Sequence, residues 1–160
     1  MKILVMSDSH GDTDSMLLAI RRTIPELILH LGDHDDDCDL TRAMFPQIPI
    51  RSVRGNCDAW SNNQDEEIFS LDGKLLFMTH GHLYGVKTGT ETIVGAAKAK
   101  GADVLLFGHT HIPCYETADG IVLINPGAIG RGRDRNAKTY AVLELKNGAV
   151  TCEIKSIDES

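Results

Sequence analysis

Five short apolar segments of this 160-residue chain each run directly into a loop that carries aspartate, asparagine or histidine. The junctions are "KILVM" before "SDSHGD", "LILHL" before "GDHDD", "IRSVR" before "GNCD", "KLLFMT" before "HGH", and "DVLLF" before "GHTH". Short apolar runs bounded by turn residues are typical of buried strands. Ligand sites of open α/β sheets gather at the carboxyl ends of the strands, so we expect the five loops to converge on one place.

The first half of the chain alternates strand and helix patterns. Strands are expected over 2–6, 26–31 and 48–53, with helices over 15–24 and 40–45 between them. Asp14 or Ser15 is available to cap the first helix. This βαβαβ rhythm predicts a parallel sheet with right-handed crossovers.

The second half carries two hairpin patterns. The first covers 66–79 and turns at Asp72-Gly73, and the second covers 139–157 and turns at Asn147-Gly148. A helix over about 90–100 and a buried strand over 103–108 follow the first hairpin. We therefore expect an α/β fold with two packed sheets, parallel in the first half and antiparallel in the second. No repeat or linker interrupts the chain, which favours a single domain over 1–160.

Composition excludes several classes of protein. The net charge of −7 disfavours a general polyanion binder, because nucleic-acid affinity rests on lysine and arginine. The absence of an aromatic stacking platform or a basic stripe argues against sequence-specific nucleic-acid binding. No apolar run approaches the ~20 residues of a membrane span, and the start lacks a signal-peptide pattern. Four cysteines without CxxC pairing fit a reducing compartment, so we expect a cytoplasmic protein. The oligomeric state, a homo-oligomer included, is left open.

The residue types at the five junctions specify a chemistry. Two aspartates, one asparagine oxygen and four histidines are donors that suit Mn²⁺, Fe, Zn²⁺, Ni²⁺ or Co²⁺. Seven donors exceed the three that one catalytic metal usually takes, whereas two metals sharing a carboxylate account for the surplus. Metals ~3.5–4 Å apart can clamp the attacking and leaving oxygens of a phosphoryl group.

Each of these residues has an ordinary explanation when it is taken alone. Asp8 is a turn former, Asn56 sits beside a glycine, and His80 is a satisfied, half-buried histidine in that interpretation. The pair His109 and His111 is better evidence for a site, since an extended segment would direct both rings to one side. The joint pattern of five strand-end loops favours a shared site over coincidence.

The series D-S-H (8–10), G-D (32–33), G-N-C-D (55–58), H-G-H (80–82) and G-H-T-H (108–111) resembles the calcineurin-like metallophosphoesterases. "RGNCD", "INPG" and the short length are most similar to their small YfcE-type phosphodiesterase branch. The resemblance covers the chain from Asp8 to about Gly127. It implies a four-layer α/β/β/α sandwich, two mixed sheets packed face to face with helices outside, and a dinuclear metal site at the sheet edge.

The same resemblance assigns ligands and cofactors position by position. The implied ligands are Asp8, His10 and His111 on the first metal, Asp33 as the bridge, and Asn56, His80 and His109 on the second. It prefers His80 to His82, a choice that the residues alone leave open. The implied cofactors are two divalent metal ions, with manganese expected first and nickel, zinc, iron or cobalt as alternatives.

One position departs from the family pattern. Many members carry a histidine after the asparagine that protonates the leaving oxygen, and here that position is Cys57. A thiol is a weaker proton donor at neutral pH, so another donor such as His82 is needed, or substrates with good leaving groups. Asp58 is expected to orient a ligand histidine. The catalytic residues implied are Asp33, Asn56, His80, Asp58 and Cys57.

These expectations together predict a metal-dependent phosphodiesterase. It would cleave a P–O ester bond of a small phosphodiester or nucleotide-like substrate by in-line attack of a metal-bridging hydroxide. The alternatives are a phosphomonoesterase, nucleotide pyrophosphatase or nuclease, and a non-catalytic interaction scaffold of the same fold. Arg131, Arg133 and Arg135 in "GRGRDR" are either phosphate-binding or part of an ordinary solvated loop, and the second interpretation is favoured.

Overall fold

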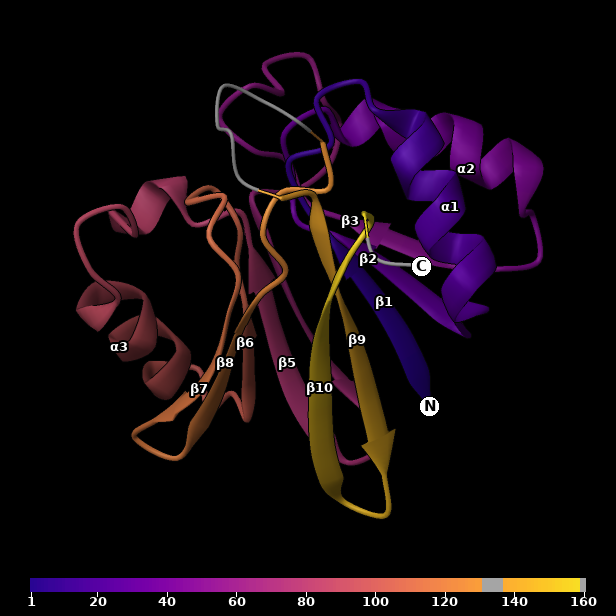
Figure 1. Cartoon of the computed structure of the whole chain (residues 1–160). Helices are drawn as coiled ribbons and strands as arrows, with labels where there is room; N and C mark the ends of the chain where they lie inside the picture. The colour runs from indigo at the N-terminus through magenta and orange to yellow at the C-terminus, as the bar shows by residue number, and fades with distance from the viewer. Residues whose placement is uncertain (131–136, 159–160) are drawn as a thin grey trace.

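Two five-stranded sheets pack face to face with helices on their outer sides in the computed structural model, which describes residues 1–130 and 137–158 (Figure 1). The first sheet has the order β10-β9-β1-β2-β3. Its strands are β1 (Lys2–Met6), β2 (Leu27–His30), β3 (Ile50–Ser52), β9 (Thr139–Lys146) and β10 (Ala149–Ser156). β1, β2 and β3 are parallel, while β9 pairs antiparallel with both β1 and β10.

The second sheet has the order β4-β5-β6-β8-β7. Its strands are β4 (Glu66–Leu71), β5 (Lys74–Thr79), β6 (Val104–Leu106), β7 (Cys114–Ala118) and β8 (Ile121–Asn125). β5, β6 and β8 are parallel, and the β4–β5 and β7–β8 hairpins add antiparallel edges. The expected α/β fold of two mixed sheets is confirmed. The expected parallel pairing in the first half of the chain is confirmed by β1, β2 and β3. The expected antiparallel second half is wrong, because β5, β6 and β8 pair in parallel.

The helices cover the outer faces of the sheets. α1 (Thr13–Thr23) and α2 (Cys38–Met44) lie outside the first sheet, and α3 (Glu91–Ala99) lies outside the second. Two short 3₁₀ turns, η1 (Asp35–Asp37) and η2 (His82–Tyr84), follow β2 and β5. Asp12 caps α1 by accepting a hydrogen bond of 3.1 Å from the Ser15 N–H. The sequence expectation of Asp14 or Ser15 as the cap is therefore wrong by two or three positions.

Strand alternation divides the core into three layers of contacts. Ile3 and Val5 of β1 face the other sheet and pack with Leu76, Met78 and their neighbours. Leu4 and Met6 of the same strand face α1 and α2 instead. A third cluster joins the second sheet to α3. Strands that are buried on both faces explain why the sequence shows continuous apolar runs rather than alternation.

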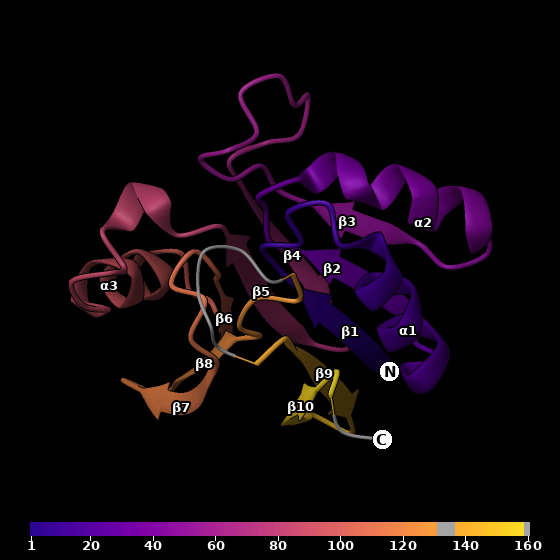
Figure 2. The ribbon, with the colours of Figure 1, turned by 45° about the horizontal axis from the view of Figure 1, so that its top comes forward.

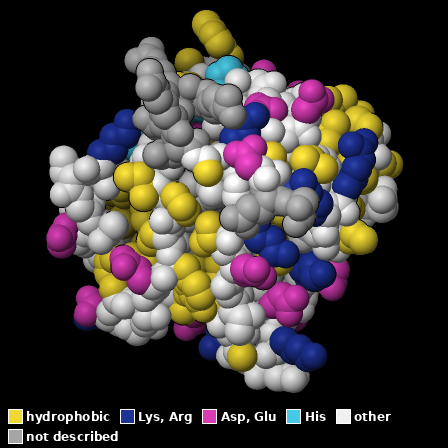
Figure 3. Space-filling model, in the orientation of Figure 1, with side chains coloured by type: hydrophobic (Ala, Val, Ile, Leu, Met, Phe, Trp, Pro, Cys, Tyr) yellow, Lys and Arg dark blue, Asp and Glu magenta, His cyan; other side chains and the backbone are white. Residues whose placement is uncertain are grey.

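One side of the molecule exposes hydrophobic side chains to solvent. Hydrophobic side chains gather over β7 and β8 and toward β10 in the space-filling view (Figure 3). Tyr115 of β7 is exposed, and so is Ile112, which lies two residues before β7 begins. Within residues 1–130 and 137–158, no helix has the length and apolar character that a membrane crossing requires.

Candidate metal centre

Two groups of three candidate metal ligands lie where the strands of both sheets end. Asp8, His10 and His111 form the first group, and Asp33, His80 and His109 form the second. The ligand atoms within each group lie within 4.8 Å of one another. The first sheet supplies the two aspartates and His10, whereas the loops after β5 and β6 of the second sheet supply the other three histidines. The site therefore straddles the seam between the sheets.

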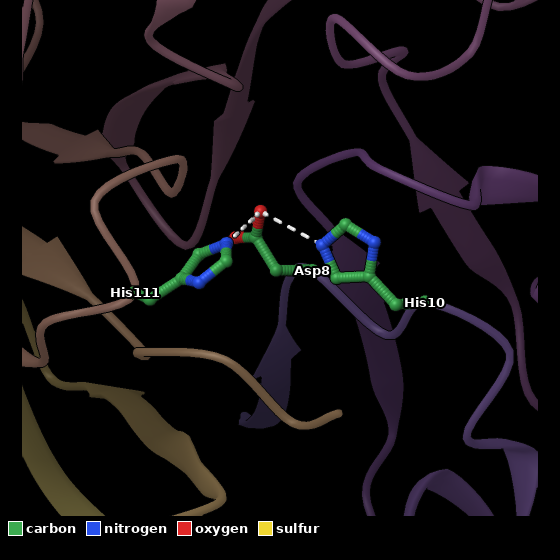
Figure 4. Close-up of side chains that lie close together, drawn as sticks. All are labelled: Asp8, His10 and His111. Atoms are coloured by element: carbon green, nitrogen blue, oxygen red, sulfur yellow. Dashed lines mark hydrogen bonds and ion pairs between the residues drawn. The ribbon is translucent and has the colours of Figure 1, made fainter. Parts of the chain in front are cut away.

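In the first group the Asp8 carboxylate lies between two imidazole rings (Figure 4). Asp8 Oδ1 is 3.2 Å from Nε2 of His111 and 3.9 Å from Nε2 of His10. The other oxygen, Oδ2, accepts hydrogen bonds from the Ser7 hydroxyl at 2.6 Å and the His109 backbone N–H at 3.2 Å. These two donors fix the carboxylate and direct Oδ1 toward the rings.

The Asp33 carboxylate of the second group lies near a histidine of each ligand group. Its Oδ1 accepts a 3.0 Å hydrogen bond from the Cys57 backbone N–H. Its Oδ2 lies 3.4 Å from Nε2 of His80 and 3.8 Å from Nε2 of His10. His80 Nδ1 donates to the Leu31 carbonyl at 2.8 Å, so its Nε2 is the atom that points into the site.

The geometry of these donors fits divalent cations. His10 Nε2 is buried and has no hydrogen-bond partner among the described residues. His80 Nε2 and His109 Nδ1 face each other at 3.2 Å. Two ligand atoms that bind the same ion, each at about 2.0–2.2 Å from it, lie roughly 3–3.5 Å from each other. Separations of this size, together with a buried nitrogen that has no hydrogen-bond partner among the described residues, fit the ligand spacing of candidate metal sites.

The electrostatics set Asp8, Asp33 and His109 in the protonation states that metals require, whereas the Asp33 and Asp8 carboxylates outweigh burial and raise the pKa of His80. Burial opposes ionisation of Asp8 and Asp33, but the histidines beside them outweigh burial and lower the pKa of both carboxyls. Burial, the His80 charge and Lys87 lower the pKa of His109 to about 4. The aspartates are therefore ionised and His109 is neutral at pH 7, as metal binding requires.

The ligand backbone adopts a conformation that L-residues rarely take. The φ angles are 55° at Asp8, 46° at His10, 64° at Asp33, 70° at His109 and 62° at His111. The left-handed region costs about 1–2 kcal/mol per non-glycine residue. Half of the ten described non-glycine residues with positive φ are these five ligands, so local strain is concentrated at the site.

Two glycines let the loops approach closely. A Cβ at Gly108 would collide with the Ser7 hydroxyl and lie 2.9 Å from Asp8 Oδ2. A Cβ at Gly55 would collide with the Asp33 carboxylate. Any larger residue at either position would displace a ligand aspartate, which is the physical reason for glycine in "GNCD" and "GHTH".

The structure places Asn56 and Cys57 at the exposed rim of the site. The Asn56 amide donates to Cys57 Sγ at 3.6 Å, while the Cys57 backbone N–H holds Asp33. Partial burial and the nearby Asp33 charge raise the pKa of the Cys57 thiol. The thiol is therefore protonated at neutral pH.

Asp58 has a different role from the one that the sequence suggested. Its carboxylate accepts four backbone N–H groups, from Asp33 and Gly55 at 2.8 Å, His34 at 2.7 Å and Asp35 at 3.2 Å. These partners are main-chain groups and include no imidazole ring. The expectation that Asp58 orients a ligand histidine is therefore wrong; the carboxylate shapes the loop that carries Asp33.

One further sequence interpretation is corrected by the geometry. The chain is not extended at His109 and His111, and their rings point into different ligand groups instead of sharing one side. His82 lies beside the site, with its ring centroid 5.4 Å from that of His80, but outside the ligand groups. Ser7 was missed, although a polar residue directly before Asp8 at the end of an apolar strand was a signal for it. Arg131, Arg133 and Arg135 lie outside the described residues.

The fold and the two-group centre define a metal-dependent phosphoesterase architecture, and comparison with known proteins identifies the family. The model of the calcineurin-like phosphoesterase superfamily domain matches residues 1–148. The probable metallophosphoesterase YsnB of Bacillus subtilis (strain 168) is 36% identical over 154 residues, covering 94% of this chain and 88% of that protein. The chain belongs to the calcineurin-like phosphoesterase superfamily, as its motifs predicted.

Other relatives agree with this assignment. The phosphodiesterase YfcE of Escherichia coli (strain K12) is 27% identical over 171 residues, covering 90% of this chain and 88% of that protein. A solved predicted phosphoesterase from Streptococcus pneumoniae TIGR4 superposes with a TM-score of 0.79 at 27% identity, over 98% of this chain and 90% of the other. Zinc-complexed Vps29 of Entamoeba histolytica has a TM-score of 0.74 at 19% identity, over 99% and 100% of the chains, and shares the fold.

Proposed function

We propose that this protein is a dinuclear-metal phosphodiesterase, a hydrolase of P–O ester bonds. The position of Asp33 carries the proposal. A single carboxylate oxygen, Oδ2, lies within 3.8 Å of His10 Nε2 in one ligand group and within 3.4 Å of His80 Nε2 in the other. Such an oxygen is suited to bridge two cations, whereas a mononuclear site would need only one of the groups.

Each ligand group would hold one divalent cation, manganese in the first instance, with nickel, zinc, iron or cobalt as alternatives. When bound, two such ions would lower the pKa of water and neutralise charge on the phosphoryl oxygens. Asp8, His10 and His111 would hold one ion, and His80, His109 and Asn56 the other. The Ser7 hydroxyl, the Cys57 N–H and the Leu31 carbonyl keep the ligand atoms aimed inward.

Substrate preference follows from the groups that are available to protonate the leaving oxygen. The Cys57 thiol is protonated but lacks the acidity of an imidazolium, and burial together with the His80 charge lowers the pKa of His82. Near pH 7 the Cys57 thiol is a weak acid and the His82 ring is largely deprotonated, which favours small diesters with good leaving groups, nucleotide-like ones included. A phosphomonoesterase or nucleotide pyrophosphatase is the alternative that a substrate panel would separate.

The four cysteines, all unpaired, support the expected cytoplasmic location.

An enzyme is favoured over a non-catalytic scaffold because both ligand groups are complete. A scaffold has no use for six preorganised donors, five of them in a strained backbone conformation. The expected in-line hydrolysis can be tested with bis(p-nitrophenyl) phosphate and p-nitrophenyl phosphate, each with Mn²⁺, Ni²⁺, Zn²⁺ and Mg²⁺. Metal content measured on the same samples separates an inactive metalloprotein from a scaffold that binds no metal.

Replacement of the shared carboxylate is the decisive test. Asp33→Asn should lower the bound metal below two ions per chain and reduce diester hydrolysis by at least a thousand-fold, because an amide oxygen bridges cations poorly. Metal content by elemental analysis and initial rates at saturating Mn²⁺ check this. The matched control Asp39→Asn changes an exposed carboxylate on α2 and should leave both quantities unchanged. Full turnover by Asp33→Asn with two ions still bound would remove the proposal.

A further inference from the structure

The single tryptophan of the chain stands in the open beside the metal centre. Trp60 is 97% exposed. It belongs to the segment between β3 and β4, which stands out from the body of the molecule at the top of Figure 2. A large aromatic side chain left in water contributes nothing to the core, and its ring is free to contact a ligand.

The loop that carries Trp60 is firmly held. Two successive turns close it, with hydrogen bonds from Asp58 N–H to the Gly55 carbonyl at 3.2 Å and from Ser61 N–H to the Asp58 carbonyl at 3.0 Å. The Ser61 hydroxyl and the Asn63 amide both donate to the Asp35 carboxylate, the latter at 2.8 Å. The backbone on either side of the indole is thus fixed before any ligand arrives, and little entropy is lost when a ligand binds.

A cavity of about 210 Å³ opens at this loop. Its lining includes His34, Asp36, Cys57 and Trp60. The His34 ring centroid lies 5.1 Å from that of His10, and the Cys57 N–H holds Asp33, so the cavity borders the metal centre. This volume is smaller than the ~300–1,000 Å³ of drug-sized sites and suits one flat ring system.

The charges around the cavity narrow the class of ligand. Among the residues that the structure describes, the lining contains three aspartates and neither lysine nor arginine. Two of the three carboxylates, Asp35 and Asp58, already accept hydrogen bonds from the loops. Such a wall repels a second phosphate and accepts a neutral ring with N–H donors, which is the chemistry of a nucleobase.

We propose that Trp60 determines specificity by stacking on the nucleobase of a nucleotide-like phosphoester whose phosphoryl group lies at the metal centre. This inference rests on the proposed function for the position of the phosphoryl group. A base that stacks on an aromatic side chain gains about five- to a hundred-fold in affinity. The substrate class is therefore nucleoside phosphoesters that carry one phosphate, in preference to sugar or glycerol phosphoesters and to polyphosphates.

The test uses the intrinsic fluorescence of Trp60. The full-length protein loaded with Zn²⁺ is titrated with adenosine 5′-monophosphate and, separately, with ribose 5-phosphate, which has the same anion without the base. We expect the nucleotide to quench the emission and to bind at least five-fold more tightly in calorimetry, while ribose 5-phosphate leaves the emission unchanged. Equal affinities, or no binding by either compound, overturn the proposal.

Variants separate stacking from loop structure. Trp60→Ala should weaken adenosine 5′-monophosphate to the affinity of ribose 5-phosphate, which itself stays unchanged, and Trp60→Phe should restore most of the difference. Tyr115→Ala removes another exposed aromatic residue, on β7, and should change neither affinity. An equal loss for both ligands in Trp60→Ala would assign Trp60 a structural role and overturn the proposal.

The two proposals fail in distinguishable ways. Hydrolysis of bis(p-nitrophenyl) phosphate without discrimination between the two ligands leaves the phosphodiesterase proposal standing and removes the role of Trp60. Discrimination without hydrolysis under any of the four metals removes the phosphodiesterase proposal and leaves a nucleotide-binding site.

Discussion

Asp58 shows how one side chain can organise a site that it does not enter. It is buried, and its two oxygens accept four main-chain N–H groups from two loops that follow different strands. Three of these donors belong to Asp33–Asp35, so the position of the shared carboxylate depends on Asp58. A carboxylate matches four donors because it offers only acceptors.

Asp58→Asn is expected to destabilise the fold by about 2–3 kcal/mol, because its NH₂ group would face backbone donors and leave them unsatisfied. Metal affinity should fall by about 10–100-fold as the Asp33 loop loosens. Urea unfolding and metal titration measure the two effects. Asp39→Asn, exposed on α2, is the control, and a stable Asp58→Asn protein with normal affinity would contradict this role.

Cys57 is the residue at which this chain departs from the common family pattern. Cys57→His would place an imidazole at the rim of the site, where a protonated ring can donate to a departing alkoxide. Turnover of diesters with alkyl leaving groups should rise about ten-fold or more. Turnover of nitrophenyl esters should change little, because nitrophenolate leaves without a proton. Parallel kcat measurements on the two substrate types would show this difference, and an equal change in both would argue against it.

The candidate ligand residues could be proposed from the sequence, whereas the main-chain contacts that support Asp33 could not. Asp8, Asp33 and His80 were found because each follows an apolar run. The Asp58 contacts join main-chain groups 23–25 positions away, and main-chain donors leave no trace in residue identity. Trp60 likewise carries no sequence motif, and only the fold places a cavity beside it.

At the level of elements, α1 begins at a capping residue that also binds Lys138, directly before β9. Asp12 accepts hydrogen bonds from the N–H and the hydroxyl of Ser15. It also forms an ion pair of 2.5 Å with Lys138. Partial burial opposes these interactions, yet they lower the pKa of the Asp12 carboxyl below its ordinary value of 3.8. The cap thus fixes α1 beside the segment that leads into β9.

Asp12→Ala should lower the free energy of unfolding by about 1–2 kcal/mol at pH 7. Because the folded-state pKa is depressed, the contribution of Asp12 is complete well above pH 3.8 and is lost as the pH falls through the lower folded value. The difference between wild type and variant should therefore shrink below about pH 4. Denaturant unfolding from pH 3 to pH 7 measures this difference; a constant difference would show that the hydroxyl and amide contacts, not the charge, matter.

Local turn chemistry explains which elements were predictable. The hairpins at Asp72-Gly73 and Asn147-Gly148 have positive φ at both positions, as their residue pairs indicated. The parallel pairing of β5, β6 and β8 was not apparent, because it is made through α3 and the β7 excursion. A run of three or five apolar residues does not indicate which strand will pair with it.

At the level of the whole molecule, the same seam carries the main core and the candidate metal centre. The core between the sheets joins β1 and β2 to β5 and β6, and the ligands sit at the carboxyl ends of those strands. Each ligand group draws on both sheets. Bound metal would therefore tie the two halves of the sandwich together at one end.

Thermal unfolding should accordingly show one cooperative transition that metal shifts upward as a whole. At a Zn²⁺ concentration of 100 times Kd, each bound ion adds about 2.7 kcal/mol, which corresponds to roughly 5–11 °C in Tm per ion for a chain of this size. Scanning calorimetry with and without a chelator measures the shift. Asp33→Asn should show little shift, and two separate transitions would mean that the sheets unfold independently.

The left-handed backbone at the ligands has a consequence for how such chains diverge. Glycine would relieve the strain at Asp8, His10, Asp33, His109 or His111, and each such change would also delete a metal ligand. Selection for catalysis and selection for thermodynamic stability thus act in opposite directions at the same five positions. A descendant released from metal chemistry should accumulate glycine there first, so the replacement of these residues by glycine would date the loss of activity within a lineage.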